Sequence, residues 1–369
     1  MNKLSINLPE IIFTDNATKT IFKKIEKKKC FLFTSKYWQN NNLLRTLKKK
    51  INIVRAVENI EPNPEIKKVQ EIFINLKKAD YILTIGGGSV IDYTKAVAAF
   101  NAIDRKQKYF KTILSKGKKF TKLTIPKIIA IPTTSGTGSE INSWGTVWDS
   151  GNKYSVSGDE LMPSCAIYDA NLCKDKPTAL TVSTGLDSLS HAFESILNIN
   201  HNPLIDEFAK IAIEKIIKFL PLVIKNPQNI EYRKEMQKAA FFSGLAMSKT
   251  KTSICHSISY PLTSIFGLPH GIASSLTLSE VSKLNLKNNK GRTSIISKAM
   301  GCSNKNLESS LISFFKKLNY DKYLDPIKNI KINKKINFIN PARSKNSLVK
   351  VSNAEASKIV KNCIKNYIK

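Results

Sequence analysis

A short apolar segment that runs into three glycines constrains the fold of this chain more than any other feature. Residues 81–85 (YILTI) predict a buried strand, and Gly86, Gly87 and Gly88 follow it directly, before Ser89 and a helical pattern. Glycines let the backbone turn tightly and approach a ligand, and a helix N-terminus presents unpaired N–H groups. The segment predicts a pyrophosphate-binding turn or an ordinary strand-to-helix turn, because GGGS is not the GxGxxG pattern of the usual dinucleotide fold.

The rest of the first half alternates between strand and helix patterns. Strands are expected in residues 30–35 (CFLFTS) and 126–134 (PKIIAIPTT), and a helix over residues 65–80. This alternation predicts an α/β domain with a parallel sheet and crossover helices.

The pattern changes at about Asp175, after which apolar residues recur at helical spacing, as in residues 203–224 and 232–248. A chain of 369 residues also exceeds the size of a single core. We therefore predict two domains, an α/β dinucleotide-binding domain over residues 1–175 and an all-α metal-binding and substrate domain over residues 176–369.

The chain carries a formal net charge of +31, with 59 lysines and arginines against 28 acidic residues. Such a charge attracts polyanions. However, the basic residues are nearly all lysines and spread along the whole chain, which favours a lysine-rich solvated surface over a nucleic-acid-binding face. We expect no nucleic-acid partner, and we expect the charge to steer anionic substrates and cofactors.

No apolar run reaches transmembrane length, and the first residues lack the apolar core of a signal peptide. The six cysteines are scattered, without a CxxC pair, as expected of free thiols in a reducing compartment. A cytoplasmic protein without a membrane partner is the expectation.

Hydroxyl side chains cluster after the third of these strands, in the segment IPTTSGTGSE of residues 131–140. They include Thr133, Thr134, Thr137 and Ser139. Hydroxyl groups and free backbone N–H groups suit the ribose and amide groups of a nicotinamide cofactor. An ordinary loop rich in serine and threonine is the alternative.

Three of the four histidines predict a metal site. Asp187 and His191 are four residues apart, so a helix would present both on one face. His256 and His270 lie beside further helical patterns, whereas His201 is expected in a loop. One carboxylate with three imidazoles suits iron(II), or alternatively zinc, with a position left open for a substrate oxygen.

Taken together, the segments GGGSVIDYTK, IPTTSGTGSE and GLDSLSHAFES, and His256 with LPHG, resemble the iron-containing (group III) alcohol dehydrogenases over nearly the whole chain. The resemblance implies the architecture that this family has in common with dehydroquinate synthase. It implies that the metal ligands are Asp187, His191, His256 and His270. It also implies that a dinucleotide, NADH or NADPH, is bound by Ser35, Asn63, Gly87, Gly88, Ser89, Asp92, Thr133, Thr134, Thr137, Ser139 and Lys153.

The resemblance further implies that hydride passes between the nicotinamide and an aldehyde whose oxygen is polarised by the metal. Lys153 and Tyr260 are the candidate catalytic side chains, and Tyr260 stands where many family members have a second histidine. Ser35, followed by Lys36, stands where an NAD-preferring member often has an aspartate, which leaves NADPH possible. A homo-oligomer is expected.

The segment from Trp144 to Trp148 and the residues around Arg343 resemble the branch that reduces phosphonoacetaldehyde to 2-hydroxyethylphosphonate. Lys153 or Arg343 could bind the phosphonate. The alternatives are core packing for the tryptophans and a surface ion pair for Arg343. For the whole chain they are a reductase of uncharged short aldehydes (a butanol or propanediol dehydrogenase type), a lyase like dehydroquinate synthase, and a nucleic-acid-binding protein on an inactive scaffold.

Overall fold

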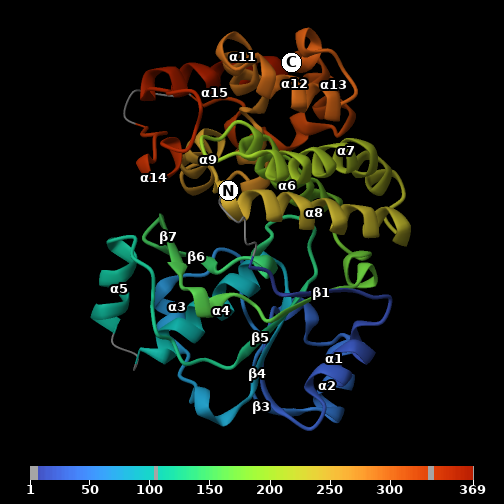
Figure 1. Cartoon of the computed structure of the whole chain (residues 1–369), viewed down its shortest axis with the longest axis vertical. Helices are drawn as coiled ribbons and strands as arrows, with labels where there is room; N and C mark the ends of the chain where they lie inside the picture. Colours follow the sequence, from blue (N-terminus) through green and yellow to red (C-terminus); the bar gives the residue numbers. More distant parts are fainter. Residues whose placement is uncertain (1–6, 104–106, 331–335, 369) are drawn as a thin grey trace. The chain divides into compact units, whose positions relative to one another are not determined.

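The computed structural model describes residues 7–103, 107–330 and 336–368. The chain divides into two compact units (Figure 1). Unit 1 comprises Met1–Thr134 and Ser139–Cys173, and unit 2 comprises Ser135–Gly138 and Lys174–Lys369. This division falls two residues before the predicted one at 175, and it also assigns the four residues 135–138 to the helical unit, which the sequence did not indicate.

Unit 1 is built on a six-stranded parallel sheet with the strand order β1-β8-β5-β4-β2-β3, as the alternating pattern predicted. The strands of the sheet are β1 (Glu10–Phe13), β2 (Lys29–Thr34), β3 (Asn52–Val57), β4 (Tyr81–Gly86), β5 (Lys127–Pro132) and β8 (Cys165–Tyr168). A separate antiparallel hairpin consists of β6 (Trp144–Asp149) and β7 (Asn152–Ser157). The helices of this unit are α1 (Ala17–Ile25), α2 (Asn42–Lys50), α3 (Ile66–Glu71), α4 (Gly88–Ala102) and α5 (Gln107–Ser115).

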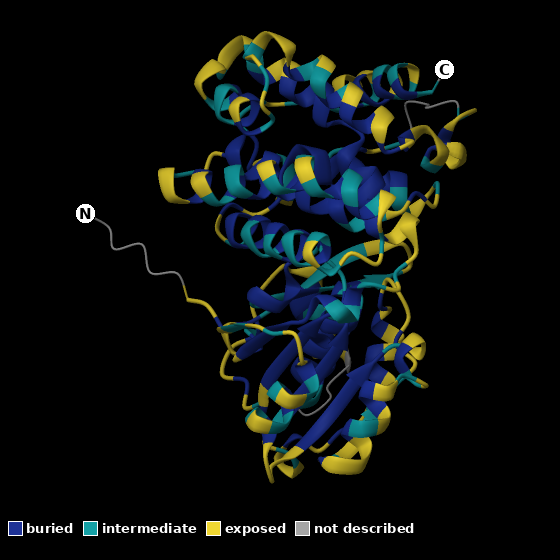
Figure 2. Cartoon of the chain, turned by 90° about the vertical axis from the view of Figure 1, so that its right-hand side faces the viewer, coloured by how far each residue is buried: buried dark blue, intermediate teal, exposed yellow. Residues whose placement is uncertain are grey.

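Helices cover both faces of this sheet, with α1 and α2 on one side and α3 and α4 on the other (Figure 1). Alternate residues of β2 therefore enter different cores: Phe31 packs with the α4 side, and Leu32 packs with the α1 and α2 side. The central strands are buried along nearly their whole length (Figure 2). This two-sided burial explains why their sequences are continuous apolar runs.

The prediction of one helix over residues 65–80 was wrong about its length. Only α3 is helical there, and after an extended stretch a single 3-10 turn follows at Leu76–Lys78. Asn101 accounts for the break, because its side-chain amide donates to Ile72 O over 2.9 Å and its carbonyl accepts from Ile74 N over 2.9 Å. These bonds to extended backbone replace the bonds of a continued helix.

Unit 2 is helical, as predicted, and in its described residues the backbone pairs as β structure only in an isolated bridge between Asn198 and Ser347. Its helices are α6 (Thr178–Ile196), α7 (Pro203–Lys225), α8 (Ile230–Thr250), α9 (Ile254–Ser264), α10 (His270–Ser275), α11 (Leu278–Asn288), α12 (Lys290–Ala299), α13 (Leu307–Lys317), α14 (Pro341–Ser344) and α15 (Asn353–Tyr367). None of the described helices is long and apolar enough to span a membrane.

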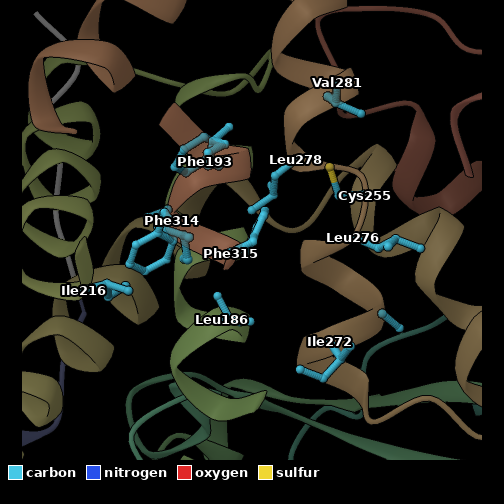
Figure 3. Packing of buried hydrophobic residues seen from close by; sticks show 14 of the residues in the cluster. Leu186, Phe193, Ile216, Cys255, Ile272, Leu276, Leu278, Val281, Phe314 and Phe315 are labelled. Carbon is cyan, nitrogen blue, oxygen red and sulfur yellow. The ribbon is translucent and has the colours of Figure 1, made fainter. Parts of the chain in front are cut away.

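Helix α6 runs through the apolar core of unit 2. Its side chains Leu186 and Phe193 belong to the same cluster as Phe314 and Phe315 of α13 (Figure 3). Residues 135–138 join this unit because Ser188 Oγ of α6 donates to their backbone at Gly136 O over 3.0 Å. Helix α6 is therefore held by packing along its length, which fixes the direction of its polar side chains.

A buried lysine organises the chain between β5 and β6 in unit 1. The Nζ of Lys95, on α4, donates to the carbonyl oxygens of Ser139 (2.6 Å), Asn142 (2.8 Å) and Trp144 (2.8 Å). The side chain is completely buried, and burial lowers the pKa of Lys95 to about 8, although the carboxylates of Asp92 and Glu140 oppose this shift. One ammonium group thus fixes the backbone of residues 139–144.

Replacing Lys95 with methionine removes the donor for these three carbonyl oxygens while keeping most of the side-chain volume. We expect Lys95→Met to lower the free energy of unfolding by about 3–5 kcal/mol, since removing one partner of a buried charged network leaves the others desolvated and unpaired. Urea denaturation measures the change, and Lys108→Met on the exposed surface of α5 is the control. Equal stability of the two variants would refute the structural role of Lys95.

Candidate metal centre and dinucleotide site

Helix α6 presents three acidic and imidazole side chains on one face. Asp187, His191 and Glu194 follow at intervals of four and three residues, so they point in the same direction from the helix. All three are buried, with exposed fractions of 4%, 5% and 2%, respectively. Charged residues are almost never buried to this extent without a partner, which marks this face as a site.

Three imidazoles surround one oxygen of Asp187. The distances from Asp187 Oδ1 are 3.4 Å to His256 Nε2, 3.8 Å to His191 Nε2 and 3.9 Å to His270 Nε2. Ligand atoms of Asp187, His256 and His270 all lie within 4.8 Å of one another. His191 lies outside that closest set, and its ring stacks on that of His256 with 4.8 Å between centroids. The structure thus brings the four predicted ligands together.

The electrostatics of the cluster suit a cation. Burial raises the pKa of the Asp187 carboxyl, but the imidazoles of His191, His256 and His270 outweigh burial and hold that pKa far below its usual range. Burial lowers the pKa of His256, but the carboxylates of Glu194 and Asp187 raise it by more than burial lowers it, so the net pKa is about 9. The site therefore stabilises positive charge next to Asp187.

These residues fit a divalent metal ion. Ligand atoms around a tetrahedral ion lie about 3.4 Å apart when the metal–ligand bonds are about 2.1 Å long. The spacing around Asp187 Oδ1, 3.4–3.9 Å, is close to this value. In addition, His256 Nε2 is buried without a hydrogen bond within the described part of the chain. In the neutral ring this nitrogen is a buried acceptor, which a metal ion would satisfy.

Helix α10 reaches Asp187 because of a glycine. A Cβ atom on Gly271 would lie 1.7 Å from the carbonyl oxygen of Ser183 and 3.1 Å from Asp187 Cβ. Only glycine permits α10 to approach the backbone of α6 so closely. The same approach lets Ser274, one turn after His270, donate to Asp187 Oδ1 over 3.3 Å.

Sequence reasoning missed Glu194 and Ser274. Both have a signal in the sequence: Glu194 lies seven residues after Asp187 and Ser274 four residues after His270, which are spacings that share a helix face. Glu194 Oε2 lies 2.5 Å from His256 Nδ1, and burial raises the pKa of Glu194, but His256 and backbone donors more than offset this rise. These contacts are visible only once α6 and α9 are packed together.

We expect Gly271→Ala to move α10 away from α6, because the Ser183 carbonyl belongs to the backbone and cannot rotate aside. His270 would then lose its place beside Asp187, and the affinity for Zn²⁺ would fall by about 10-fold or more. Isothermal titration calorimetry of metal-free protein measures this affinity. Gly291→Ala, where an added Cβ meets no atom within 4 Å, should bind as wild type, and unchanged affinity in Gly271→Ala would disprove the role.

In unit 1 the turns after β4 and β5 lie side by side. Thr133 N donates to Gly86 O over 2.9 Å, and a Cβ on Gly87 would lie 3.0 Å from Thr134 Cγ2. Gly87 is the N-cap of α4, whose first residues are Gly88 and Ser89. The structure thus brings the predicted pyrophosphate-binding glycines next to the predicted hydroxyl cluster.

Of the other predicted dinucleotide residues, Asp92 and Ser139 bond to each other within unit 1. Asp92 accepts from Ser139 Oγ over 2.5 Å and from Thr146 N over 2.9 Å, so its carboxylate fixes the segment after β5. Asn63 adopts a left-handed backbone with φ of 54°. Ser35 follows β2 at the carboxyl end of the sheet, and Thr137 lies in the segment that belongs to unit 2. Their contact with a dinucleotide stays a prediction.

The hairpin holds the residues predicted to bind substrate in unit 1. Trp148 and Lys153 are opposite each other on β6 and β7, and Lys153 Nζ lies 5.8 Å from the centroid of the Trp148 ring. Trp148 N also donates to Pro64 O over 2.8 Å. Trp144 and Trp148 are both partly exposed, so core packing does not account for either of them completely.

In unit 2, Tyr260 lies four residues after His256 on α9, and Arg343 on α14 donates from Nε to its hydroxyl oxygen over 2.9 Å. The hydrogen bond joins a guanidinium to the helix that carries a predicted metal ligand. The alternative for Arg343, a surface ion pair, does not describe this contact.

Comparison with known proteins shows which family the chain resembles. The model of the family "Iron-containing alcohol dehydrogenase" matches residues 9–170, and that of the "Fe-containing alcohol dehydrogenase family, C-terminal" matches residues 181–334. The NADPH-dependent butanol dehydrogenase of Clostridium saccharobutylicum is 32% identical over 72% of this chain and 69% of its own length. The 1-propanol dehydrogenase of Citrobacter freundii is 28% identical over 77% of this chain and 74% of its own length.

Among solved structures, the sulfoacetaldehyde reductase of Bifidobacterium kashiwanohense in complex with NAD⁺ is similar, with a TM-score of 0.86, 26% identity and coverage of 98% of both chains. The two family models together match most of the chain, and the buried carboxylate and imidazoles supply a fitting metal site. The chain therefore belongs to the iron-containing alcohol dehydrogenase family, and it is an oxidoreductase of alcohols and aldehydes whose cofactors are a divalent metal and NAD(P).

Proposed function

We propose that this enzyme reduces a short aldehyde that carries an anionic group, with phosphonoacetaldehyde as the substrate and 2-hydroxyethylphosphonate as the product. The hydrogen bond between Arg343 and Tyr260 carries the proposal. It holds a permanent positive charge beside the helix turn that follows His256, a predicted metal ligand.

An arginine in this position suits a phosphonate for a geometric reason. The guanidinium is planar, always charged and able to donate two parallel hydrogen bonds to oxygens of one phosphonate or phosphate group. The bond through Nε to Tyr260 restricts rotation of the guanidinium, and Arg343 is partly buried, which limits screening of its charge by water. An aldehyde one carbon away from the anionic group would be anchored at a fixed distance from Arg343.

The chain's own residues divide the work within this proposal. Asp187, His191, His256 and His270 would hold the metal, which supplies Lewis-acid polarisation of the aldehyde oxygen when bound. Arg343 would bind the anionic group and Tyr260 would orient it, so that the aldehyde carbon meets the nicotinamide in one orientation. Lys153, beside the Trp148 ring on the hairpin, would contact the dinucleotide.

Two comparisons bear on the choice of substrate. The sulfoacetaldehyde reductase, by its name, acts on an aldehyde with a sulfonate group, which supports an anionic substrate here. The butanol and 1-propanol dehydrogenases, by their names, act on uncharged alcohols, and they favour the second candidate, a reductase of uncharged short aldehydes. Charge on the substrate is the property that separates the two.

The test compares phosphonoacetaldehyde with propanal and butanal, using protein loaded anaerobically with iron(II) and following NADH or NADPH oxidation. We expect a higher kcat/KM for the phosphonate. Arg343→Ala should raise the KM for phosphonoacetaldehyde by about 10- to 100-fold, the value of a charge-assisted bidentate contact, and leave propanal reduction nearly unchanged.

Lys345→Ala is the matched control, since it removes an exposed positive charge two residues from Arg343 and leaves the bond to Tyr260 intact. It should behave as wild type with every substrate. Equal or better kcat/KM with propanal or butanal would overturn the anionic substrate and leave the uncharged aldehydes. An equal loss on all substrates in Arg343→Ala would assign Arg343 a structural role.

Cofactor choice is tested at Ser35, which lies at the end of β2 where an aspartate would repel the 2′-phosphate of NADPH. We propose that the wild type accepts NADPH, and we expect Ser35→Asp to raise the KM for NADPH by about 10-fold without raising that for NADH. Steady-state kinetics with both cofactors measures the shift. A parallel change for the two cofactors would remove Ser35 from the ribose site.

A further inference from the structure

The carboxylate of Glu194 is almost completely removed from water, since only 2% of the residue is accessible. It lies on α6, on the same face as Asp187 and His191. A buried carboxylate is costly unless it is paired and hydrogen-bonded. Glu194 meets this requirement through hydrogen bonds to the start of α9 and to His256, a predicted metal ligand.

One oxygen of Glu194 caps helix α9. Its Oε1 accepts from Cys255 N (2.6 Å), His256 N (3.1 Å) and Ser253 Oγ (3.0 Å). Cys255 and His256 are in the first turn of α9, where backbone N–H groups lack partners within the helix. The N-cap residue, Ser253, makes no side-chain cap bond of its own, so Glu194 of another helix does this instead. These bonds lock the carboxylate in place.

The other oxygen of Glu194 faces the imidazole of His256. Its Oε2 lies 2.5 Å from Nδ1. An ionised carboxylate is an acceptor only, so Nδ1 must carry the proton of this bond. In the neutral ring, the form that binds a metal, Nε2 is then left with its lone pair, and it lies 3.4 Å from Asp187 Oδ1 at the centre of the imidazole cluster.

We propose that Glu194 is the positioning residue of the metal centre: it fixes the ring orientation and the tautomer of His256, so that Nε2 is a ready metal ligand. Histidine ligands commonly donate their second N–H to a carboxylate, which fixes the tautomer and raises the basicity of the ligating nitrogen. This inference rests on the candidate metal centre and is independent of the substrate proposal.

Glu194→Gln is a sharp test because the three donors that surround Oε1 dictate how the amide must lie. The amide oxygen has to face Ser253, Cys255 and His256 N, which keeps the cap of α9. The amide NH₂ then faces His256 Nδ1 as a donor and selects the opposite tautomer, with the proton on Nε2. The variant therefore reverses the tautomer with almost no change in shape.

The affinity of metal-free protein for Co²⁺ is the primary measurement, and the visible absorption of bound Co²⁺ reports the coordination. We expect Glu194→Gln to weaken Co²⁺ binding by about 10- to 100-fold, a typical effect of removing such a carboxylate, and to alter the spectrum. The thermal unfolding temperature of the metal-free protein should stay close to that of wild type. Glu280→Gln is the matched control: it neutralises a buried carboxylate on α11 that accepts a hydrogen bond from Asn362 of α15, and it should bind Co²⁺ as wild type.

Wild-type affinity and spectrum in Glu194→Gln would overturn the proposal. If that variant fails to fold, nuclear magnetic resonance of the ¹⁵N-histidine-labelled wild type decides the question, since the chain contains only four histidines. With Zn²⁺ bound, the proposal requires a slowly exchanging proton on His256 Nδ1 and coordination through Nε2. Coordination through Nδ1 would refute it.

Discussion

The contacts of the buried Asp187 carboxylate are the interactions on which the arrangement of α6, α9 and α10 in unit 2 depends. A charge buried to 96% would destabilise the fold if it stood alone, because transfer of an ion out of water costs several kcal/mol. Here, His256, His191, His270 and the hydroxyl of Ser274 all approach its Oδ1 atom. Helices α6, α9 and α10 therefore meet around this carboxylate. The close approach of α10 to α6 at Gly271 lets His270 reach it.

Unit 1 solves a similar problem with the opposite charge. Lys95 is completely buried on α4, and backbone oxygens of residues 139–144 surround its ammonium group. Asp92, one turn earlier on the same helix, accepts hydrogen bonds from the Ser139 hydroxyl and the Thr146 N–H. Helix α4, which begins at the third glycine, thus also fixes the segment that starts at Ser139, the last of the predicted dinucleotide-binding hydroxyls. Motifs separated by about 50 residues act as one structural assembly.

The contacts of Glu194 and of Arg343 divide the candidate site by chemical task. Glu194 orients one imidazole through its Nδ1 atom and is almost completely buried, so the proposed role is to position a ligand. Arg343 is held by Tyr260 and is partly exposed, so it is suited to meet a substrate. Both contacts involve α9, which carries His256 between its cap and Tyr260. The predicted metal ligand His256 and the proposed substrate anchor Arg343 thus both depend on the position of a single short helix.

Periodicity and residue type alone predicted a parallel α/β unit and a helical unit, because the strands of buried sheets and amphipathic helices are local patterns. They also marked Asp187, His191, His256 and His270 as candidate metal ligands. The break in the helix predicted over 65–80 was not local, since it depends on Asn101. The spacing of Glu194 is local, but its role is not, because the groups that donate hydrogen bonds to its carboxylate lie 59 to 62 residues away. The assignment of residues 135–138 to unit 2 likewise needed the packing of Gly136 against α6. Sequence spacing reports which side chains share a face, whereas only tertiary packing decides which faces meet.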